Sequence, residues 1–259
     1  MTSVDAVLAA YDERAAFAGG EARTARPRLL AEAIANAVHV AEVPCGPGHF
    51  LRDYAAANCG VTLVDGSPRM LTAAVAAGVH AGIPTHRMRT VSCRVQRLPA
   101  LPGVDTVIVP NAALNQLTAQ TSLPRVLGAL RAAMAPGARL LMQVLCRHDN
   151  RTVDAASFYD PHQPAGAWQT DRRLDPATCG GAVARRRRVH HEDGDAVRID
   201  FAYQDSAGAR LHTASVDLRL LEPHGLGAVL HAAAFQDMRF LPGDGGLSEV
   251  LAVANGTSR

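Results

Sequence analysis

The stretch HVAEVPCGPGHFLRDYA, residues 39–55, decides how this chain folds. It runs from apolar residues through an acid, a proline and two glycines into a sequence that favours a helix. Where a strand passes through glycines into a helix, the backbone N–H groups can approach a ligand closely, because glycine carries no side chain. The stretch therefore predicts an α/β protein that holds a nucleotide-like cofactor at Gly46 and Gly48.

The next strand, VTLVD at residues 61–65, ends in an acid. An acid at this place can accept hydrogen bonds from the two hydroxyls of a ribose, which suits Asp65. A dinucleotide-binding turn would carry a third glycine where this chain has Leu51, so the turn is poorly matched to a pyrophosphate. An adenosine with a small charged tail fits better.

The chain alternates between strand-like and helix-like segments up to residue 145, which predicts a mostly parallel sheet with helices on both faces. Ser67 and Pro68 suit the cap and first turn of a helix that Gly78 would close. The remaining helices are expected at residues 4–18, 25–37, 48–57 and 123–135 and, near the end, 223–235; the remaining strands at 39–43, 86–93, 104–110, 138–145, 236–242 and 248–254.

The alternation of strands and helices stops after Leu145. Residues 147–180 read as irregular, and residues 182–220 read as three strands separated by the polar turns EDGD and DSAGA. We expect one domain, residues 1–259, with a Rossmann-like seven-stranded sheet and an antiparallel insert at about residues 147–220 that acts as a lid.

At this point the chain resembles the class I S-adenosylmethionine-dependent methyltransferases of small molecules. Their motif E/D-x-G-x-G-x-G corresponds to residues 42–48, and their acid at the end of the second strand corresponds to Asp65. The turn APGARL at residues 135–140 and the ending LHAAAFQDMRF at 230–240 also resemble family motifs. The resemblance covers about residues 5–145 and 220–255 and implies S-adenosylmethionine as cofactor.

The resemblance also implies the residues that bind the cofactor. The glycine motif would border its methionine part, Asp65 would hold the ribose, and Tyr11 on a leading helix would close over it. The implied set is Tyr11, Glu42, Pro44, Cys45, Gly46, Gly48, Asp65, Gly66, Ser67, Met70, Arg94, Val95 and Pro110. Two residues depart from the family pattern: Pro44 replaces the first glycine and lacks an N–H, and Arg94 stands where relatives commonly carry an acid.

Acceptor contacts are expected beyond the carboxyl ends of the strands, because ligands of open α/β sheets bind there. Asn111 and Asn115 follow the fourth strand of the sheet, and His162 lies in the irregular stretch, so we take these three as candidate catalytic residues. Tyr159 and Trp168 are further candidates in the same loop, which is expected to act as a lid, and His190 is a second candidate, beside His162, for a general base. Methyl transfer is an in-line displacement at the sulfonium methyl, for which the protein supplies mainly alignment and desolvation.

Composition narrows the acceptor. The formal net charge of +2 over 259 residues is too small for a typical nucleic-acid binder. The arginines at 185–188 would alternate between the two faces of a strand, so they favour a solvated or salt-bridged strand. The five cysteines include no CxxC pair, and no apolar run reaches the roughly 20 residues of a membrane span. We expect a cytoplasmic enzyme with a small-molecule substrate, no metal and no membrane partner; a homodimer stays open.

Other functions stay open alongside methyl transfer. Fold does not fix the reaction, and the same cofactor could close on itself to azetidine-2-carboxylate with release of methylthioadenosine. A non-catalytic scaffold would bind the cofactor weakly. A nucleic-acid methyltransferase would show salt-dependent binding, and residues 110–113, PNAA, lack the Asn/Asp-Pro-Pro-Tyr pocket that such an enzyme uses.

Overall fold

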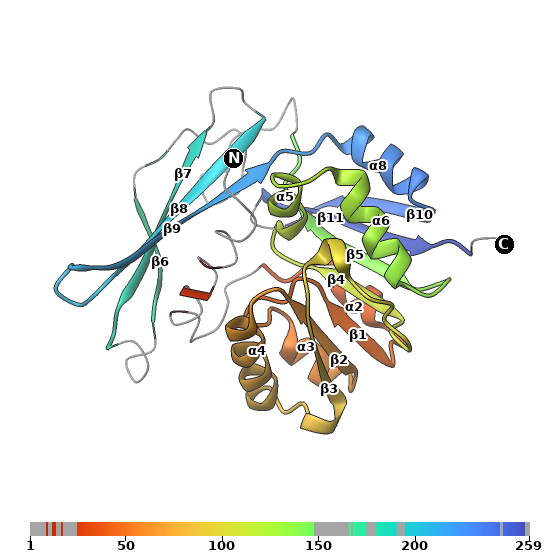
Figure 1. The fold of residues 1–259 in the computed structure, drawn as a ribbon, viewed down its shortest axis with the longest axis horizontal. Helices are drawn as coiled ribbons and strands as arrows, with labels where there is room; N and C mark the ends of the chain where they lie inside the picture. Colours follow the sequence, from red (N-terminus) through yellow and green to blue (C-terminus); the bar gives the residue numbers. More distant parts are fainter. Residues whose placement is uncertain are drawn as a thin grey trace.

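The computed structural model describes residues 9, 12, 13, 17, 25–147, 166, 168–174, 180–190, 195–243 and 246–256. In this part of the chain, seven strands form a sheet in the order β10-β11-β5-β4-β1-β2-β3, and four more form a separate sheet in the order β6-β7-β8-β9. Figure 1 shows the four-stranded sheet standing to one side of the α/β part. The expected architecture, a mostly parallel sheet and an antiparallel insert, is confirmed.

The strands of the larger sheet are β1 (His39–Glu42), β2 (Gly60–Asp65), β3 (Met88–Ser92), β4 (Thr106–Val109), β5 (Arg139–Val144), β10 (Phe235–Pro242) and β11 (Ser248–Ala254). The five strands β1, β2, β3, β4 and β5 pair with their neighbours in parallel, and β11 pairs antiparallel with both β5 and β10. Every residue of β2 and β4 is buried, as expected for central parallel strands covered on both faces.

The helices are α2 (Leu30–Ile34), α3 (Leu51–Ala56), α4 (Pro68–His80), α5 (Ala113–Thr118), α6 (Leu123–Ala133) and α8 (Pro223–Ala232), with short 3₁₀ turns η1 (Thr85–Arg87) and η2 (Val95–Arg97). One apolar core packs α5, α6 and α8 against one face of the sheet, and a second packs α2, α3 and α4 against the other. Both faces of the parallel sheet are therefore covered (Figure 1).

Two helix predictions need correction. α4 does begin at Ser67, whose Oγ accepts the N–H of Met70, but it continues past Gly78 to His80. Gly78 lies inside the helix and does not end it. A Cβ at this residue would stand 2.5 Å from Sδ of Met88, so the glycine makes room for β3. Of the helix expected at 25–37, only α2 forms, because side chains of the sheet bind the backbone of residues 25–29.

The antiparallel sheet consists of β6 (Gln169–Arg173), β7 (Val183–His190), β8 (Ala196–Gln204) and β9 (Arg210–Arg219). Its first strand corrects the prediction that residues 147–180 are irregular throughout. The sequence QTDRR shows no alternation of apolar and polar residues, so no pattern marks β6, which is held by pairing with β7.

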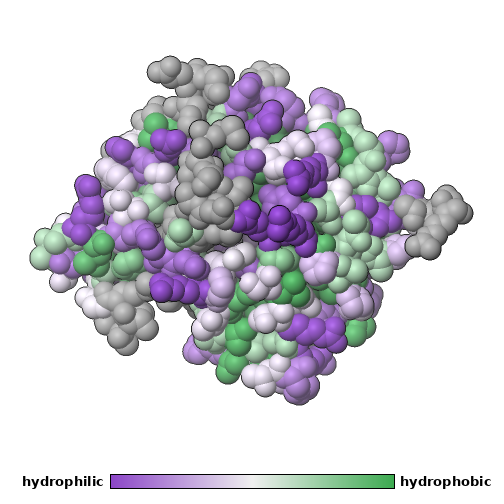
Figure 2. All heavy atoms as spheres, viewed as in Figure 1, coloured by the Kyte–Doolittle hydropathy of each residue, from purple (hydrophilic) through white to green (hydrophobic). Residues whose placement is uncertain are grey.

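The surface seen in Figure 2 mixes hydrophilic and hydrophobic residues. The large apolar side chains that are exposed are Val38, Val79 and Leu211, in three different parts of the fold, and Phe240 and Leu241, neighbours on β10. A few exposed apolar residues of this kind are ordinary on a protein surface. Among the described residues, no helix is both long and apolar enough to cross a membrane.

Candidate active site at the carboxyl ends of the parallel strands

The glycine loop lies where the strand order reverses, between β4, β1 and β2. Two backbone bonds continue the sheet into the loop: the N–H of Val43 donates to Ile108 O, and the N–H of Cys45 donates to Val64 O. The Val43–Pro44 peptide bond is cis. In open α/β sheets, the crevice at such a reversal is where ligands bind.

The two glycines of the loop both have positive φ, +50° at Gly46 and +87° at Gly48. At Gly48 a Cβ would stand 2.3 Å from Cδ1 and 3.0 Å from Cγ of the buried Leu51. At Gly46 the nearest atom to such a Cβ would be Nε2 of His49, at 3.4 Å. The loop therefore needs glycine at both positions, and it presents bare backbone to a ligand.

Asp65, at the end of β2, bonds the glycine loop directly. Its Oδ2 accepts the N–H of Gly46 at 2.8 Å and its Oδ1 accepts that of Ser67 at 2.9 Å. Burial raises its pKa, and these backbone hydrogen bonds oppose that rise. An ionised carboxylate has about four acceptor positions, so Asp65 keeps acceptor capacity beyond the bonds from Gly46 and Ser67. Asp65 thus fits a ligand with two neighbouring hydroxyls.

Ser67 joins this site to the N-terminal segment. Its Oγ accepts the N–H of Met70 and donates to Oδ1 of Asp12. Met70 itself is buried, and Gly66 beside it is half-buried. Asp12 was not among the residues predicted from the sequence; its distance of 55 residues along the chain from Ser67 hides the contact. Tyr11, the residue predicted to close over the cofactor, lies outside the described residues.

Arg94 and Val95 lie on the same side of the site. The N–H of Cys93 donates to Asp65 O, which carries the chain from β3 past the end of β2. Arg94 is half-buried and caps η2, and Val95 is buried. Their expected contacts with an adenine stay predictions that this arrangement allows.

Glu42 supports the loop from within the protein. Its side chain is fully buried; Oε1 accepts the N–H of His49 at 2.8 Å, and Oε2 accepts the O–H of Tyr54 at 2.7 Å. Burial raises its pKa to about 7, although these hydrogen bonds oppose the rise. The expectation of a direct contact between Glu42 and the cofactor is therefore corrected: the carboxylate holds the start of α3 and shapes the glycine loop.

The turn after β4 has an unusual backbone. Asn111 and Ala112 have φ of 50° and 56°, a left-handed conformation that is uncommon for residues other than glycine and that asparagine adopts more readily than alanine. Gln143 of β5 holds the turn: its Oε1 accepts the N–H of Asn111, and its carbonyl accepts that of Ala112. Pro110 is buried, whereas Asn111 is half-buried. Asn111 is thus held where an acceptor is expected.

Asn115 does not fit its predicted catalytic role. It is fully buried, and its amide bonds three backbone groups: Nδ2 donates to the carbonyls of Leu145 and Arg219, both at 2.7 Å, and Oδ1 accepts the N–H of Leu145 at 2.8 Å. These groups stand at the start and end of the antiparallel insert. Asn115 therefore fastens the insert to α5. His162 and Tyr159 lie outside the described residues.

The antiparallel sheet turns an apolar face toward this end of the larger sheet. Val197, Ile199 and Leu218 of that face pack with Ala112, Leu145 and Leu247. We call it the inner face; by register it also carries Phe201 and Tyr203 of β8 and Ala214 and His212 of β9. Phe17 of the N-terminal segment stacks on Tyr203 with ring centroids 4.5 Å apart.

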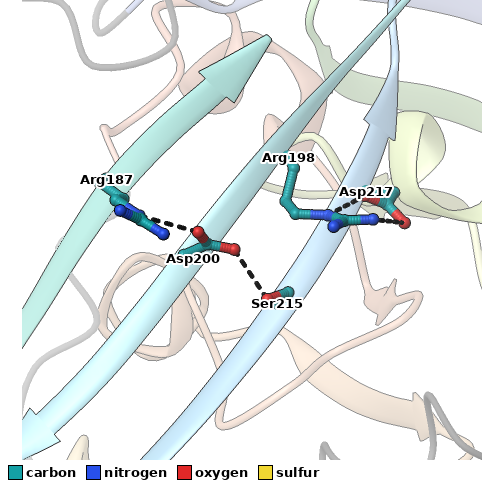
Figure 3. A network of polar contacts seen from close by, with 5 residues as sticks. All are labelled: Arg187, Arg198, Asp200, Ser215 and Asp217. Carbon is teal, nitrogen blue, oxygen red and sulfur yellow. Dashed lines mark hydrogen bonds and ion pairs between the residues drawn. The ribbon is translucent and has the colours of Figure 1, made fainter. Parts of the chain in front are cut away.

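The opposite, outer face is polar. Arg187 pairs with Asp200, which also accepts the O–H of Ser215, and Arg198 pairs with Asp217 (Figure 3). Arg185 and Arg187 share this face, and both contact Trp168: Arg185 donates to its carbonyl, and Arg187 stands 4.8 Å from its ring centroid. Arg186 occupies an inner-face position of the register. The three arginines whose side chains are described thus divide between the two faces, as predicted.

These residues suit S-adenosylmethionine. Asp65 offers acceptor positions for a ribose diol, Gly46 and Gly48 leave the loop open to a close approach, and no glycine stands at residue 51 to accommodate a pyrophosphate. Among the described residues, no group of three or more histidine, cysteine or acidic side chains is placed to hold a metal ion.

Comparison with known proteins agrees with this geometry. Residues 40–137 match the sequence model of a family described as a methyltransferase domain. No significant match was found among curated proteins.

Three solved structures resemble the chain over nearly its whole length. A sugar N-methyltransferase from a Streptoalloteichus species has a TM-score of 0.65 and 20% identity, covering 96% of this chain and 88% of that one. An amino pentose methyltransferase from Micromonospora echinaspora, solved with S-adenosylmethionine, has a TM-score of 0.60 and 18% identity, and the match covers 98% of this chain and 92% of that one. The CcbJ methyltransferase from Streptomyces caelestis has a TM-score of 0.63 and 16% identity, and the match covers 95% of this chain and 90% of that one. At these identities the likeness shows a shared fold.

The matched domain contains the whole site from β1 to the turn before β5, including the glycine loop, Asp65 and the turn at Asn111. The strand order, with one antiparallel strand beside β5, completes the agreement. The chain therefore carries a methyltransferase domain at residues 40–137 on a fold shared with S-adenosylmethionine-dependent methyltransferases, which makes it a transferase whose methyl donor is S-adenosylmethionine.

Proposed function

We propose that the enzyme methylates an amino nitrogen of a small molecule, with an amino sugar as the leading class of acceptor. The observation that carries the proposal is the antiparallel sheet, whose inner face packs on Ala112, directly after Asn111. Two similar structures are described as sugar N- and amino pentose methyltransferases. The alignments cover 98% and 96% of this chain, so the likeness extends over the insert as well as the cofactor domain.

The proposed site has a cofactor side and an acceptor side. On the cofactor side, Asp65 and the glycine loop fix the donor, which when bound supplies an electrophilic methyl group. On the acceptor side, the turn at Asn111 lies below the inner face of the antiparallel sheet, so a small acceptor would be enclosed between two parts of the protein. Such enclosure excludes water and fixes the angle of attack, which are the main contributions of a protein to this reaction.

Asn111 is the residue proposed to orient the acceptor. Its backbone is fixed by the bond to Gln143 Oε1 at 3.0 Å, so the side chain projects from a rigid turn. A neutral amide oxygen can accept a hydrogen bond from an amine N–H and turn the nitrogen lone pair toward the methyl group. We expect Asn111→Ala to lower kcat at least 30-fold and to change the affinity for S-adenosylmethionine less than threefold.

Paired acceptors test the proposal directly. The protein is incubated with S-adenosylmethionine and amino sugars or simple cyclic amines, each matched with the analogue that carries a hydroxyl in place of the amine. Mass spectrometry then follows S-adenosylhomocysteine and the methylated product. We expect turnover with amines and at least 100-fold less with the hydroxyl analogues; the reverse preference would contradict N-methylation.

A reaction without acceptor tests the alternative of cofactor cyclisation. Incubation with S-adenosylmethionine alone should leave it intact. Release of methylthioadenosine at a rate proportional to enzyme concentration would show that the cofactor is itself the substrate, and the proposal of methyl transfer to an amine would fall.

A further inference from the structure

The turn between β4 and α5 contains two successive residues with a left-handed backbone. The φ angle is 50° at Asn111 and 56° at Ala112. In this conformation the Cβ of alanine approaches the following carbonyl oxygen, whereas asparagine is one of the few residues that adopt it readily, so most of the strain lies at Ala112. A strained backbone persists only where surrounding contacts hold it, and such residues gather at functional sites.

Gln143 on β5 supplies the contacts that hold this turn. The parallel ladder between β4 and β5 ends before Pro110, which has no N–H to extend it. Gln143 binds the next two N–H groups of the chain: its side-chain Oε1 accepts that of Asn111 at 3.0 Å, and its backbone carbonyl accepts that of Ala112 at 3.1 Å. One residue of β5 therefore closes the whole turn.

The side chain of Gln143 is fixed at both ends of its amide. It is only 2% exposed, and its Nε2 donates to Ala25 O at 2.7 Å while Oε1 binds Asn111. A buried amide that loses such a partner is destabilised by the full desolvation of the group left behind. Ala112 is buried too, in the apolar cluster with Leu145 and Val197. The turn is thus held by β5 and packed against the antiparallel sheet.

A second alanine with a left-handed backbone offers a comparison. Ala234 follows α8 with φ of 61°, and its N–H donates to His231 O at 2.9 Å, a local bond at the end of its own helix. Its neighbour Phe235 pairs with Ala254 beside the start of β5, so Ala234 lies at the end of the sheet away from Asn111. The two alanines therefore carry the same backbone strain, one at the site and one remote from it.

We propose that Gln143 is a positioning residue of methyl transfer, which holds the turn of Asn111 and Ala112 in its left-handed form and so directs the side chain of Asn111 toward the acceptor. This rests on the proposed role of Asn111 in orienting the acceptor. Without Gln143 the turn would relax toward the backbone conformations that alanine prefers, and Asn111 would leave its place. The loss should fall on kcat, because Asp65 and the glycine loop are held by bonds of their own.

The first test is Gln143→Met, a change of similar shape that removes both side-chain bonds. With the amine acceptor that turns over fastest, we expect kcat to fall about tenfold and the affinity for S-adenosylmethionine, measured by calorimetry, to stay within about twofold. Hydrogen exchange at the amides of Asn111 and Ala112 should become about tenfold faster, which needs no acceptor to measure. A kcat within twofold of the parent, or unchanged exchange, would overturn the proposal.

A rescue experiment tests whether the left-handed turn is the route. Glycine adopts this backbone without strain, so Ala112→Gly should recover about fivefold in the kcat of Gln143→Met and change that of the parent less than about twofold. Ala234→Gly is the matched control: it should raise the thermal midpoint and leave the kcat of Gln143→Met as it was. No recovery with Ala112→Gly, or equal recovery with Ala234→Gly, would overturn the route through the turn.

A further control addresses the bond from Gln143 to Ala25. Glu249, directly opposite Gln143 on β11, accepts the N–H groups of Arg28 and Leu29 in the same segment of chain but has no printed bond to the turn. Glu249→Gln should therefore disturb that segment and keep kcat within about threefold of the parent. A loss of kcat as large as that of Gln143→Met would assign the effect to residues 25–29 and contradict the role of the turn.

Failure of this proposal can be told apart from failure of the proposed function. Turnover of hydroxyl analogues in preference to amines would contradict N-methylation, while the exchange of Asn111 and Ala112 would still test the role of Gln143. Should Gln143→Met fail to fold, Gln143→Asn retains an amide but is one carbon shorter and cannot reach both partners. The same fall in kcat, the same faster exchange and the same rescue by Ala112→Gly are expected of it.

Discussion

The two sheets of this enzyme are held together in opposite ways. The cofactor side is built from buried polar groups: Glu42 and Asp65 each accept hydrogen bonds from the protein backbone within one short stretch of chain. The antiparallel sheet carries its polar pairs on the outer face, where Arg187, Arg198 and Asp217 are partly exposed (Figure 3). A buried group without its partner costs far more than an exposed one. Substitutions on the cofactor side should therefore have the larger effects.

The largest effect is expected at Gly48. Gly48→Ala combines a φ of +87° with a Cβ that would meet Leu51 at 2.3 Å, and together strain and overpacking should cost roughly 4 kcal/mol. If the loop moves to relieve this strain, the same free energy is lost from cofactor binding. At about 1.4 kcal/mol per factor of ten, the affinity for S-adenosylmethionine should fall by nearly 1,000-fold. Calorimetric titration measures the loss.

Gly82 provides the control for Gly48. Its φ is +91°, yet a Cβ there would have nothing within 4 Å. Gly82→Ala carries the backbone strain without the contact, so it should cost about 1 kcal/mol of stability and leave cofactor affinity unchanged. A loss of affinity in Gly82→Ala similar to that in Gly48→Ala would show that backbone strain, and not the shape of the loop, controls binding.

The second effect is a pH dependence of stability that comes from Glu42. Its pKa of about 7 in the folded protein exceeds its ordinary 4.5, so the stabilisation is present below pH 4.5 and is lost as pH rises through 7. At about 1.4 kcal/mol per pH unit, the loss over this range is roughly 3 kcal/mol. The difference in the free energy of unfolding between Glu42→Gln and the parent should therefore shift in favour of the variant by that amount as pH rises from 4.5 to 7. Urea unfolding at several pH values measures this difference.

His49 works in the opposite direction over the same range. Burial lowers its pKa from 6.5 to about 4, so its stabilisation is present above pH 6.5 and is lost as pH falls through 4. Because His49 is only half-buried, we expect its contribution to be smaller than that of Glu42. Glu42→Gln should therefore lose stability on acidification more steeply than the parent, and His49→Asn in that background should flatten the profile. A parallel profile for parent and Glu42→Gln would contradict the assignment to Glu42.

The third effect lies at the joint between the two sheets. Asn115→Leu removes three buried hydrogen bonds and leaves backbone groups of Leu145 and Arg219 without them, at a cost of roughly 2–3 kcal/mol. Hydrogen exchange should become faster in β7, β8 and β9, whereas the affinity for S-adenosylmethionine should stay within twofold.

Thr118→Val is the matched control for Asn115. Thr118 is buried on the same helix, and its Oγ1 donates to Asn115 O at 3.0 Å. Losing this one bond should cost about 1 kcal/mol without a local change of exchange in the antiparallel sheet. If Asn115→Leu instead weakened cofactor binding as Gly48→Ala does, the two sides of the molecule would be less independent than their contacts indicate.

The same contrast explains what could be predicted from sequence. The alternation of strands and helices, the glycine loop and the acid of β2 are encoded in local patterns: buried apolar runs, two glycines at a turn and a capping serine. Asp65 and Ser67 were therefore found at their places beside the loop. Gly46, Gly48 and Asp65 lie within one short stretch of sequence, so their arrangement around the loop could be predicted, while their contacts with the cofactor stay predictions.

The acceptor side was harder to predict because its contacts are distant in sequence. Asn115 follows β4 as an acceptor residue should, but only the fold shows that Leu145 and Arg219 take both N–H groups of its amide and that Leu145 also donates to its oxygen. Gln143 and Glu249 lie in apolar strands and carry no motif, and Asp12 meets Ser67 across 55 residues. A pattern within one segment cannot reveal partners that the tertiary fold brings together.

The smallest effect is expected on the outer face of the antiparallel sheet. Arg198 and Asp217 are directly opposite each other on β8 and β9, 2.9 Å apart, and each is about one-third exposed or more. Asp217 raises the pKa of Arg198, which shows attraction, but water screens an exposed pair. A double-mutant cycle with Arg198→Ala and Asp217→Ala should give a coupling below about 1 kcal/mol that shrinks in 1 M salt. A coupling above about 2 kcal/mol that resists salt would mean that this face is buried in the working enzyme. The outer face would then no longer differ from the cofactor side in the exposure of its polar pairs, and the contrast between the two sheets would be wrong.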